Sequence, residues 1–359
     1  MKKKILTILG TRPELIKMFP LIKRLDKNFN NVLVWSGQHY DFELVKRNFL
    51  DVRLRSPNVK IKVNKKENIF FQIQIKLHKI IKKIKPDAII YHGDTFTTLA
   101  ASIVSNYFFS NILKIHIEGG YRSGDETQIE ERARTTSDQL SDVIYVTRDN
   151  EKENLLKENK KKDIHVVGNT INDAINEILA HTKNKNNILI KKNLKKNNYI
   201  LITIHRSENV DNFHRLKKII KIINHLSKTY KIFFPIHPRT RKNLKKFNLK
   251  LEPEILISTP TSYSETILLI KNSFFCLTDS GGIQEEAVIL KKRCLIPSDK
   301  TPHHHYIIKG SNSLLNLNKE NYLSQTQNFL KNLKKNKVKI FKHKKNSSKL
   351  IIKSLKNYL

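Results

Sequence analysis

Short apolar runs alternate with longer amphipathic segments along almost the whole chain of 359 residues. The short runs suit buried strands, and the segments between them carry apolar residues at helical spacing. Strands that alternate with helices predict βα units and parallel sheets, an α/β fold class. In the first half, strands are expected at Ile5–Leu9, Val32–Trp35, Ala88–Tyr91, Leu113–Ile117, Val143–Val146 and Ile164–Val167. Helices are expected around Glu14–Leu25, Phe70–Ile84, Thr97–Tyr107 and Ile129–Leu140.

The alternation pauses at Gly168-Asn169-Thr170, and a second series begins at Tyr199–Thr203. Further strands are expected near Lys231–Phe234, Ile255–Ile257, Phe274–Leu277 and Arg293–Ile296, and helices at Val210–Ser227, Ser264–Ile270, Ile283–Leu290 and Asn346–Tyr358. The chain is too long for one ordinary core and suits two domains. Two doubly wound domains in one chain predict a ligand cleft between them, at the carboxyl ends of both sheets.

The chain is strongly basic, with 68 lysine and arginine residues against 32 aspartate and glutamate residues and a net charge of +36. Nucleic-acid binding therefore has to be considered. Most of the excess is lysine mixed with asparagine, scattered over the expected helices and loops, with no aromatic-interleaved basic stripe and no known nucleic-acid-binding signature. We interpret the charge as a solvated surface without a nucleic-acid partner, which can help to attract an anionic substrate.

The cysteines and the N-terminus indicate the compartment. Cys276 and Cys294 both lie in apolar strand-like runs, which predicts buried thiols in a reducing environment. The first apolar run is too short for a signal peptide, and Arg12 and Glu14 follow it at once. No apolar segment approaches the length of a membrane span. We therefore expect a cytoplasmic protein.

Carboxylates stand on both sides of one glycine-containing loop. Glu118 ends an expected strand, Gly119-Gly120 follows it, and Glu130 and Glu131 open the next expected helix. Two carboxylates that face each other across a cleft suit proton transfer, because different surroundings can separate their pKa values. Ordinary acidic residues at a helix N-terminus would explain the pattern equally well. Asp94, at another strand end, is either a helix cap or a third carboxylate of the site.

Other strand ends carry groups suited to anions. Gly10-Thr11-Arg12-Pro13-Glu14 opens a helix and places the Arg12 guanidinium beside its N-terminus. His205 ends the first strand of the second series and is placed to act across the cleft. The backbone N–H groups of Ser280, Gly281 and Gly282 form a cradle for phosphate oxygens, and Glu286 is suited to bind ribose hydroxyls. An ordinary strand-to-helix turn is the alternative for the two glycine-containing motifs, and a structural histidine is the alternative for His205.

The tract His303-His304-His305 suggests a metal site. Adjacent histidines do not converge on one ion from a regular element, and no acidic partner has ligand spacing. We therefore expect no metal ion.

Taken together, these residues resemble the UDP-N-acetylglucosamine 2-epimerase family, nearly from end to end. Any one motif is weak, but seven or more in the family order are very hard to obtain by chance. The motifs are Gly10-Thr11-Arg12-Pro13-Glu14, Ser36-Gly37-Gln38-His39, His92-Gly93-Asp94-Thr95, His116-Ile117-Glu118-Gly119-Gly120-Tyr121-Arg122, Glu130-Glu131, Gly168-Asn169-Thr170, His205-Arg206-Ser207-Glu208-Asn209 and Asp279–Glu286.

The resemblance implies a GT-B-like fold with two Rossmann-like domains, 1–168 and 169–344, and a C-terminal helix (345–359) that crosses back to complete the first. It also implies an isomerase that needs no cofactor. Such an enzyme removes UDP from C1 and the proton from C2 of a UDP-2-acetamido sugar, which gives a 2-acetamidoglucal. It then re-adds UDP with a proton on the opposite face of C2. Because the C2 proton is not acidic, its removal must be coupled to departure of the diphosphate.

Matched position by position, the resemblance assigns three groups of residues. The catalytic group contains the acid/base carboxylates and the partners that assist C1–O cleavage: Asp94, Glu118 and Glu130, with Arg12 and His205. The group that binds substrate and UDP contains Lys17, Arg134, Ser280, Gly281, Gly282 and Glu286. Gln38 and His39 match a second site, for an activating sugar nucleotide, and the Gly37-Gln38-His39 motif resembles the non-hydrolysing members. The family also implies a homodimer.

The sequence departs from the family pattern in three places. Ile204 replaces the usual glycine before His205, and Ile129 replaces the common proline before Glu130. Ser298–Tyr306 stands where the family usually reads Thr-Glu-Arg-Pro-Glu, so the accepted sugar can differ at C3 or C6. Two alternatives remain: a hydrolysing 2-epimerase, which releases a free N-acetylmannosamine-type sugar and UDP, and a GT-B glycosyltransferase with the same UDP cradle.

Overall fold

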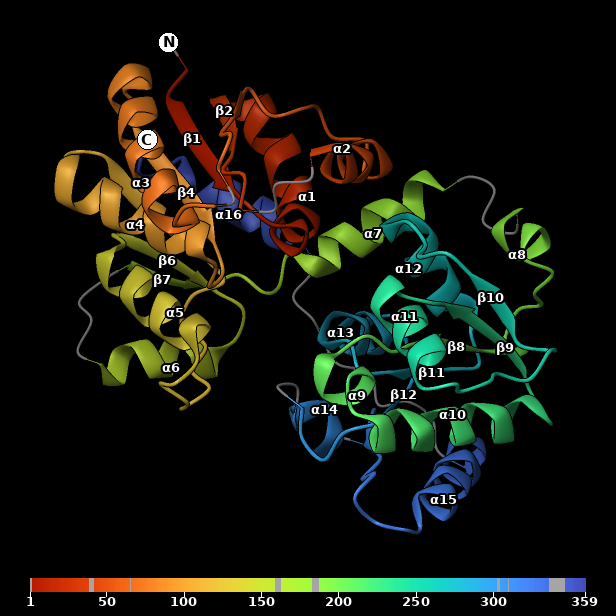
Figure 1. Ribbon diagram of the computed structural model, residues 1–359. Coiled ribbons are helices and arrows are strands. Elements are labelled where there is room, and N and C mark those ends of the chain that lie inside the picture. The colour runs from red at the N-terminus through yellow and green to blue at the C-terminus, as the bar shows by residue number, and fades with distance from the viewer. Residues whose placement is uncertain are drawn as a thin grey trace. The chain divides into compact units, whose positions relative to one another are not determined.

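The computed structural model describes residues 2–38, 42–64, 66–158, 163–182, 187–301, 304–308, 310–335 and 346–359. It contains two compact α/β units, each built on its own parallel sheet (Figure 1). The first unit contains the chain through Glu177 and the C-terminal helix, and the second begins at Ile178. The division therefore falls within a helix, later in the chain than the boundary expected at Gly168.

The first unit has a seven-stranded sheet of order β3-β2-β1-β4-β5-β6-β7. Its strands are β1 (Lys4–Leu9), β2 (Asn30–Trp35), β3 (Val59–Lys60), β4 (Ala88–His92), β5 (Leu113–Ile117), β6 (Val143–Val146) and β7 (Asp163–Val166). The order reverses beside β1, as in other doubly wound sheets, where ligands bind at the carboxyl ends of the strands next to the reversal. Polar side chains that follow β1, β4 and β5 therefore share one sheet edge.

The helices of the first unit are α1 (Arg12–Asn28), α2 (Phe42–Asp51), α3 (Ile69–Ile84), α4 (Phe96–Phe108), α5 (Ile129–Leu140), α6 (Asp149–Lys157) and α16 (Ser347–Leu355), and α7 (Ile171–His181) is the helix in which the two units divide. Helix α1 begins at a capping box, in which the Thr11 side chain accepts from the Glu14 N–H and the Glu14 carboxylate accepts from the Thr11 N–H. The C-terminal helix α16 packs against α1, so the chain returns to its first unit.

The second unit has a six-stranded sheet of order β10-β9-β8-β11-β12-β13. Its strands are β8 (Tyr199–Thr203), β9 (Lys231–Pro235), β10 (Leu256–Ser258), β11 (Phe275–Thr278), β12 (Cys294–Ile296) and β13 (Ser313–Leu314). Its helices are α8 (Asn187–Lys191), α9 (Ser207–Val210), α10 (Phe213–Ser227), α11 (Pro238–Lys246), α12 (Tyr263–Asn272), α13 (Gly281–Ile289), α14 (His304–Ile308) and α15 (Tyr322–Lys335). Both cysteines are buried free thiols on adjacent strands.

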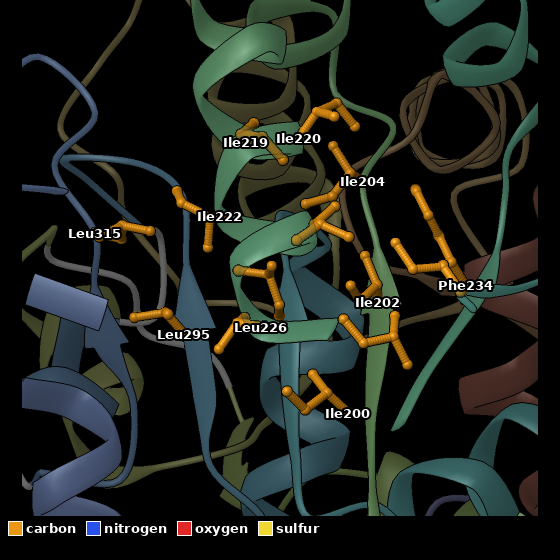
Figure 2. Packing of buried hydrophobic residues seen from close by; sticks show 14 of the residues in the cluster. Ile200, Ile202, Ile204, Ile219, Ile220, Ile222, Leu226, Phe234, Leu295 and Leu315 are labelled. Atoms are coloured by element: carbon orange, nitrogen blue, oxygen red, sulfur yellow. The ribbon is translucent and has the colours of Figure 1, made fainter. Parts of the chain in front are cut away.

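Isoleucine-rich packing holds this sheet against α10 (Figure 2). The buried side chains of α10 recur at helical spacing and include Leu216, Ile219, Ile220, Ile222, Ile223 and Leu226. They meet Ile200 and Ile202 of β8 and Phe234 of β9. Full burial of one such side chain stabilises the fold by about 1.5–3 kcal/mol. The core thereby fixes β8, whose carboxyl end leads to His205.

The α/β class predicted from the sequence is confirmed. The helix expected at Val210–Ser227 begins later, as α10 at Phe213, because Asn212 caps it by accepting from the Arg215 N–H; Val210 ends the short helix α9. The two-residue strands β3 and β13 and the helices α2, α6, α8, α11, α14 and α15 had not been expected. In the part of the chain that the structure describes, no helix is long and apolar enough to cross a membrane.

Candidate active site

Glu118 directly follows β5 and is held by two neighbours. One carboxylate oxygen forms an ion pair with the Nζ of Lys17 from α1, and the other lies 3.2 Å from the Nε2 of His92 at the end of β4. Burial raises the pKa of Glu118, but the Lys17 ammonium and the hydrogen bond from His92 outweigh burial and hold the pKa well below its usual value. Glu118 is therefore an ionised carboxylate.

The backbone of Glu118 is also unusual. Its φ of +66° lies in the left-handed region, which residues other than glycine seldom adopt. Such conformations persist only where the surroundings enforce them, and they cluster at functional sites. Gly120 follows with a φ of +79°, and a Cβ there would lie 2.5 Å from the carbonyl oxygen of Glu151. The loop after β5 thus requires a glycine at position 120.

Arg134 joins two further carboxylates. Its Nη2 forms an ion pair with Asp94, and its Nη1 forms one with Glu131. The guanidinium carbon lies 4.7 Å from the ring centroid of Tyr121, a cation–π arrangement. Thr95 caps α4 by accepting from the Thr98 N–H, so Asp94 is not that cap. Its side chain instead joins the charged group.

Glu131, rather than Glu130, is the carboxylate of α5 that shares the Arg134 guanidinium with Asp94. Glu131 is only 4% exposed, and it also accepts from the backbone N–H groups of Ser123 and Gly124, at 2.9 and 3.2 Å. Glu130 is exposed one residue earlier, and within the described part of the chain it makes no ion pair. Its acid/base role stays a prediction. The sequence did carry a signal for Glu131, because its i, i+3 spacing from Arg134 allows the two side chains to pair on one face of a helix.

Arg12 is exposed at the first residue of α1, on a turn that Glu14 holds in place. Glu14 is 2% exposed and accepts from the N–H groups of Gly10 and Thr11 at 2.9 and 2.7 Å and from the Thr95 hydroxyl at 2.8 Å. Burial raises the pKa of Glu14 despite these bonds. Glu14 therefore links the turn after β1 to the turn after β4, a role not anticipated from the sequence.

Gln38 lies beside the same turns. Its side-chain oxygen accepts from the N–H and the hydroxyl of Thr97, at 2.9 and 2.8 Å. It thereby gives a partner to one of the first N–H groups of α4, which have none within the helix. His39 lies outside the described residues. The second sugar-nucleotide site expected at Gln38 and His39 stays a prediction.

In the second unit, Asp279 organises the turn that carries His205. Asp279 is 2% exposed and accepts from the backbone N–H groups of His205 and Arg206 and from the Asn209 amide, at 3.0–3.1 Å. The Nδ1 of His205 lies 3.4 Å from an Asp279 oxygen, and the His205 side chain is 37% exposed. His205 is thus oriented and accessible. Asp279 had been noted only as the first residue of the glycine motif.

His237 lies next to His205, with 5.7 Å between their ring centroids. Burial lowers the pKa of His237, and the neighbouring His205 and Arg239 lower it further. A neutral His237 therefore sits beside His205.

Helix α13 begins at the predicted phosphate cradle. Ser280 is its N-cap residue, and Gly281 and Gly282 are its first two residues. The Ser280 N–H already donates to the Thr278 hydroxyl at 3.0 Å, so the N–H groups of the two glycines are the better candidates for an anion. Glu286 is 7% exposed, and a Cβ at Gly282 would lie 4.0 Å from its Oε1. Its carboxylate therefore reaches the start of the helix.

Metal binding finds no support in the described residues. They contain no group of three or more His, Cys, Asp or Glu side chains arranged to hold an ion. Of the histidine tract, His303 lies outside the described residues.

Comparison with known proteins identifies relatives over most of the chain. Residues 23–356 match the family model of UDP-N-acetylglucosamine 2-epimerase. A UDP-N-acetylglucosamine 2-epimerase of Methanococcus maripaludis is 38% identical, over 91% of this chain and 92% of the relative. A UDP-2,3-diacetamido-2,3-dideoxy-D-glucuronate 2-epimerase of Pseudomonas aeruginosa is 30% identical, over 87% of this chain and 88% of the relative.

A solved structure resembles the whole chain. The Methanocaldococcus jannaschii UDP-GlcNAc 2-epimerase in complex with UDP-GlcNAc and UDP has a TM-score of 0.83 and 36% sequence identity, and the match covers 99% of each chain. The ordered motifs, the fold and these relatives agree. The chain belongs to the UDP-N-acetylglucosamine 2-epimerase family.

Proposed function

We propose that the chain inverts C2 of UDP-N-acetylglucosamine, which gives UDP-N-acetylmannosamine, and that it is a non-hydrolysing member of its family. The observation that carries this proposal is Glu118, an ionised carboxylate at a strand end between Lys17 and His92. A second charged group, around Asp94, lies at the end of the next strand of the same sheet. Inversion of a carbon centre requires proton removal on one face and proton delivery on the other.

The reaction proceeds by elimination and re-addition. A carboxylate takes the proton from C2 while the C1–O bond breaks, and the electron pair of the C2–H bond becomes the C1=C2 double bond. UDP leaves with the electrons of the C1–O bond, which gives the 2-acetamidoglucal. A protonated group then delivers a proton to the opposite face of C2, and a UDP oxygen re-forms the bond to C1. Asp94, Glu118 and Glu130 are the proposed acid/base groups.

Lys17 controls how strong a base the Glu118 carboxylate is. A carboxylate with a strongly lowered pKa is a weak base, because the ammonium stabilises its charge. When the anionic substrate competes for the Lys17 ammonium, Glu118 loses part of that stabilisation and becomes a stronger base. Substrate binding thus turns a resting ion pair into an acid/base group.

Cations and backbone N–H groups bind the departing diphosphate and stabilise its negative charge. We propose that the diphosphate binds at the first residues of α13, with Glu286 on the ribose hydroxyls. Arg12 and His205 stabilise the charge that develops on the diphosphate as the C1–O bond breaks. Asp279 accepts from the backbone N–H of His205 and lies 3.4 Å from its Nδ1, and so fixes the orientation of the ring for this role.

A proton NMR time course with UDP-N-acetylglucosamine in D2O tests the proposal. We expect deuterium at C2 and the appearance of UDP-N-acetylmannosamine. Free N-acetylmannosamine and UDP would instead identify a hydrolysing enzyme. Glycosyl transfer to an added acceptor without C2 exchange would identify a glycosyltransferase, and the proposal would fail.

A related substrate, modified at C3 or C6, is the second candidate. It is favoured by the unusual segment Ser298–Tyr306, in which the Thr301 hydroxyl donates to the Gln284 side chain at 2.6 Å. The Pseudomonas aeruginosa relative is named for a 2,3-diacetamido sugar. The same NMR assay with a UDP-2,3-diacetamido sugar decides: a higher kcat/KM than for UDP-N-acetylglucosamine would make the modified sugar the substrate.

We further propose that the protein is a homodimer. An exposed apolar strip follows α3 and the end of α4, where Phe71 and Ile75 are each 59% exposed, Phe108 is 64% exposed and Tyr107 is 72% exposed. Strips of this kind mark interaction sites. In sedimentation velocity, we expect a dimer for the wild type and a monomer for Phe71→Glu/Ile75→Glu. If the double variant remains dimeric, the interface lies on another surface of the protein.

The remaining expectations concern charge and compartment. We propose a cytoplasmic protein whose +36 charge does not serve nucleic-acid binding. Association with RNA or DNA should therefore vanish at physiological salt. Tight binding that survives 150 mM salt, on the order of the ionic strength in cells, would contradict this.

A further inference from the structure

A buried histidine lies behind the carboxylates. His116 of β5 and Asp138 of α5 are both 0% exposed. The Nδ1 of His116 lies 2.8 Å from Asp138, and its Nε2 lies 2.7 Å from the carbonyl oxygen of Gly93. Gly93 immediately precedes Asp94. His116 thus connects α5 to the turn that carries one of the acid/base candidates.

Asp138 also holds the loop that follows Glu118. Its second oxygen accepts from the Gly120 N–H at 3.0 Å and from the Nη1 of Arg122 at 2.8 Å. The loop packs so closely that a Cβ at Gly119 would lie 2.3 Å from an Asp138 oxygen. Along α5, Asp138 lies about two helical turns beyond Glu131, and both residues belong to the buried side of the helix.

Three separate segments therefore meet at this pair. They are the turn with Asp94, the loop after Glu118 and the helix with Glu130 and Glu131. His116 and Asp138 are themselves fully buried, so neither side chain is exposed to touch substrate. The pair connects the backbone supports of all three proposed carboxylates.

The hydrogen bonds hold the His116 ring from both sides. A backbone carbonyl can only accept, so the Nε2 of His116 donates to Gly93. The Nδ1 shares a hydrogen bond with one oxygen of Asp138, whose other oxygen accepts from Gly120 and Arg122. Burial raises the pKa of Asp138, but His116 and Arg122 outweigh burial and hold it below its usual value. Both ring nitrogens of His116 are therefore engaged, and the ring has one fixed orientation.

We propose that His116 and Asp138 are the positioning residues of the acid/base site. Each ring nitrogen of His116 holds one support: the Nε2 holds the turn of Asp94, and the Nδ1, through Asp138, holds α5 together with the loop of Glu118. This inference rests on the proposed epimerisation. Its expected effect is on the chemical step, because misplacement of an acid/base group by about 1 Å can slow a reaction about a hundredfold.

Two amide substitutions separate the two links. His116→Asn places an amide N–H near the position of Nδ1, so it keeps the bond to Asp138 and loses Gly93. His116→Gln places an amide N–H near the position of Nε2, so it keeps Gly93 and loses Asp138. We expect each variant to lower kcat about ten- to a hundredfold and to change KM less than about twofold, because UDP binding resides in the other unit.

Ser141→Ala is the matched control. It removes a buried hydroxyl that bonds Tyr91 at 2.6 Å in the same unit, but it leaves the bonds of His116 intact. Its kcat, corrected for the folded fraction, should equal that of the wild type. A kcat loss in the His116 variants no larger than that in Ser141→Ala would overturn the proposal.

A measurement on the wild-type protein keeps the test independent of whether a variant folds. In the protein labelled with 15N-histidine, the Nε2 of His116, assigned by its loss in His116→Gln, should carry a hydrogen that exchanges slowly with solvent, because it donates to a buried carbonyl oxygen. An Nε2 without hydrogen would refute the link to Gly93. Wild-type C2 exchange is measured in parallel: its absence would refute the proposed function, whereas exchange with insensitive His116 variants would refute only the positioning role.

Discussion

Arg134 allows a quantitative test of how the first unit tolerates buried charge. The side chains of Arg134 and Glu131 are 9% and 6% exposed, and Arg134 also pairs with Asp94. Arg134→Met keeps much of the side-chain volume but leaves Glu131 as a buried charge without its cation. Removing one partner of a buried ion pair costs about 3–5 kcal/mol. Because Glu131 still accepts from two backbone N–H groups, we expect the lower end, about 3 kcal/mol.

The fluorescence of Trp35 measures this loss. The chain has one tryptophan, and Trp35 is buried in β2, so its signal follows the first unit alone. This matters because a chain of two units need not unfold in one step. With a urea m-value of about 2–3 kcal/mol/M, a loss of about 3 kcal/mol lowers the urea midpoint by about 1–1.5 M.

A second substitution separates the buried charge from lost packing. In Glu131→Gln/Arg134→Met the charge itself is gone, so the double variant should be more stable than Arg134→Met by about 1–2 kcal/mol. Lys3→Met is the control, because Lys3 and Asp87 form an exposed pair, with side chains 50% and 39% exposed, that contributes less than about 1 kcal/mol. A double variant no more stable than Arg134→Met would show that the uncompensated charge is not the cause.

Three further outcomes follow from the site. Glu118→Gln should keep the fold and slow deuterium exchange at C2 about 10²–10⁴-fold in the NMR assay, and a near-normal rate would remove Glu118 from the acid/base group. Gly282→Ala should leave the thermal midpoint nearly unchanged, since its Cβ would meet only Glu286, at 4.0 Å. If phosphate binds at the start of α13, the same variant should raise KM about tenfold. An unchanged KM would show that the phosphate binds elsewhere. The pKa of Asp138 is lowered from its ordinary 3.8, so its stabilising effect is present above that pH and is lost as pH falls through the lowered value. The urea midpoints of the wild type and of Asp138→Asn, followed by Trp35, should therefore converge below about pH 4, and parallel curves would contradict this assignment.

Much of the fold could be predicted because its strands are buried. Leu113–Ile117 and Val143–Val146 were expected with the bounds that the structure shows. Asp142 and Thr147 directly flank the second of these strands, and Glu118 directly follows the first. The edge strands β3 and β13 have two residues each, too few to carry a periodic pattern. Edge strands are short and carry little apolar signal, so a sequence reveals the centre of a sheet better than its borders.

The site was predictable where it depends on topology and not where it depends on side-chain direction. Carboxyl ends of neighbouring parallel strands share an edge, which is why Asp94 and Glu118 could be grouped in advance. The ion pair between Lys17 and Glu118 joins residues 101 positions apart, and no local spacing encodes it. The choice between Glu130 and Glu131 depends on the rotation of α5 about its axis, which only packing decides.

The return of the chain to its first unit has a consequence for biosynthesis. Helix α16 contributes the buried side chains of Ile351, Ile352 and Leu355 beside α1, yet it follows the whole second unit in the sequence, so the ribosome makes it later. Every residue of the second unit emerges before the residues that complete the first, whereas domains generally fold as units and in order from the N-terminus. The second unit can thus close its core while an apolar side of α1 is still uncovered. A premature stop just before Ser347 would leave that side permanently open, and such a product is a natural target for chaperones.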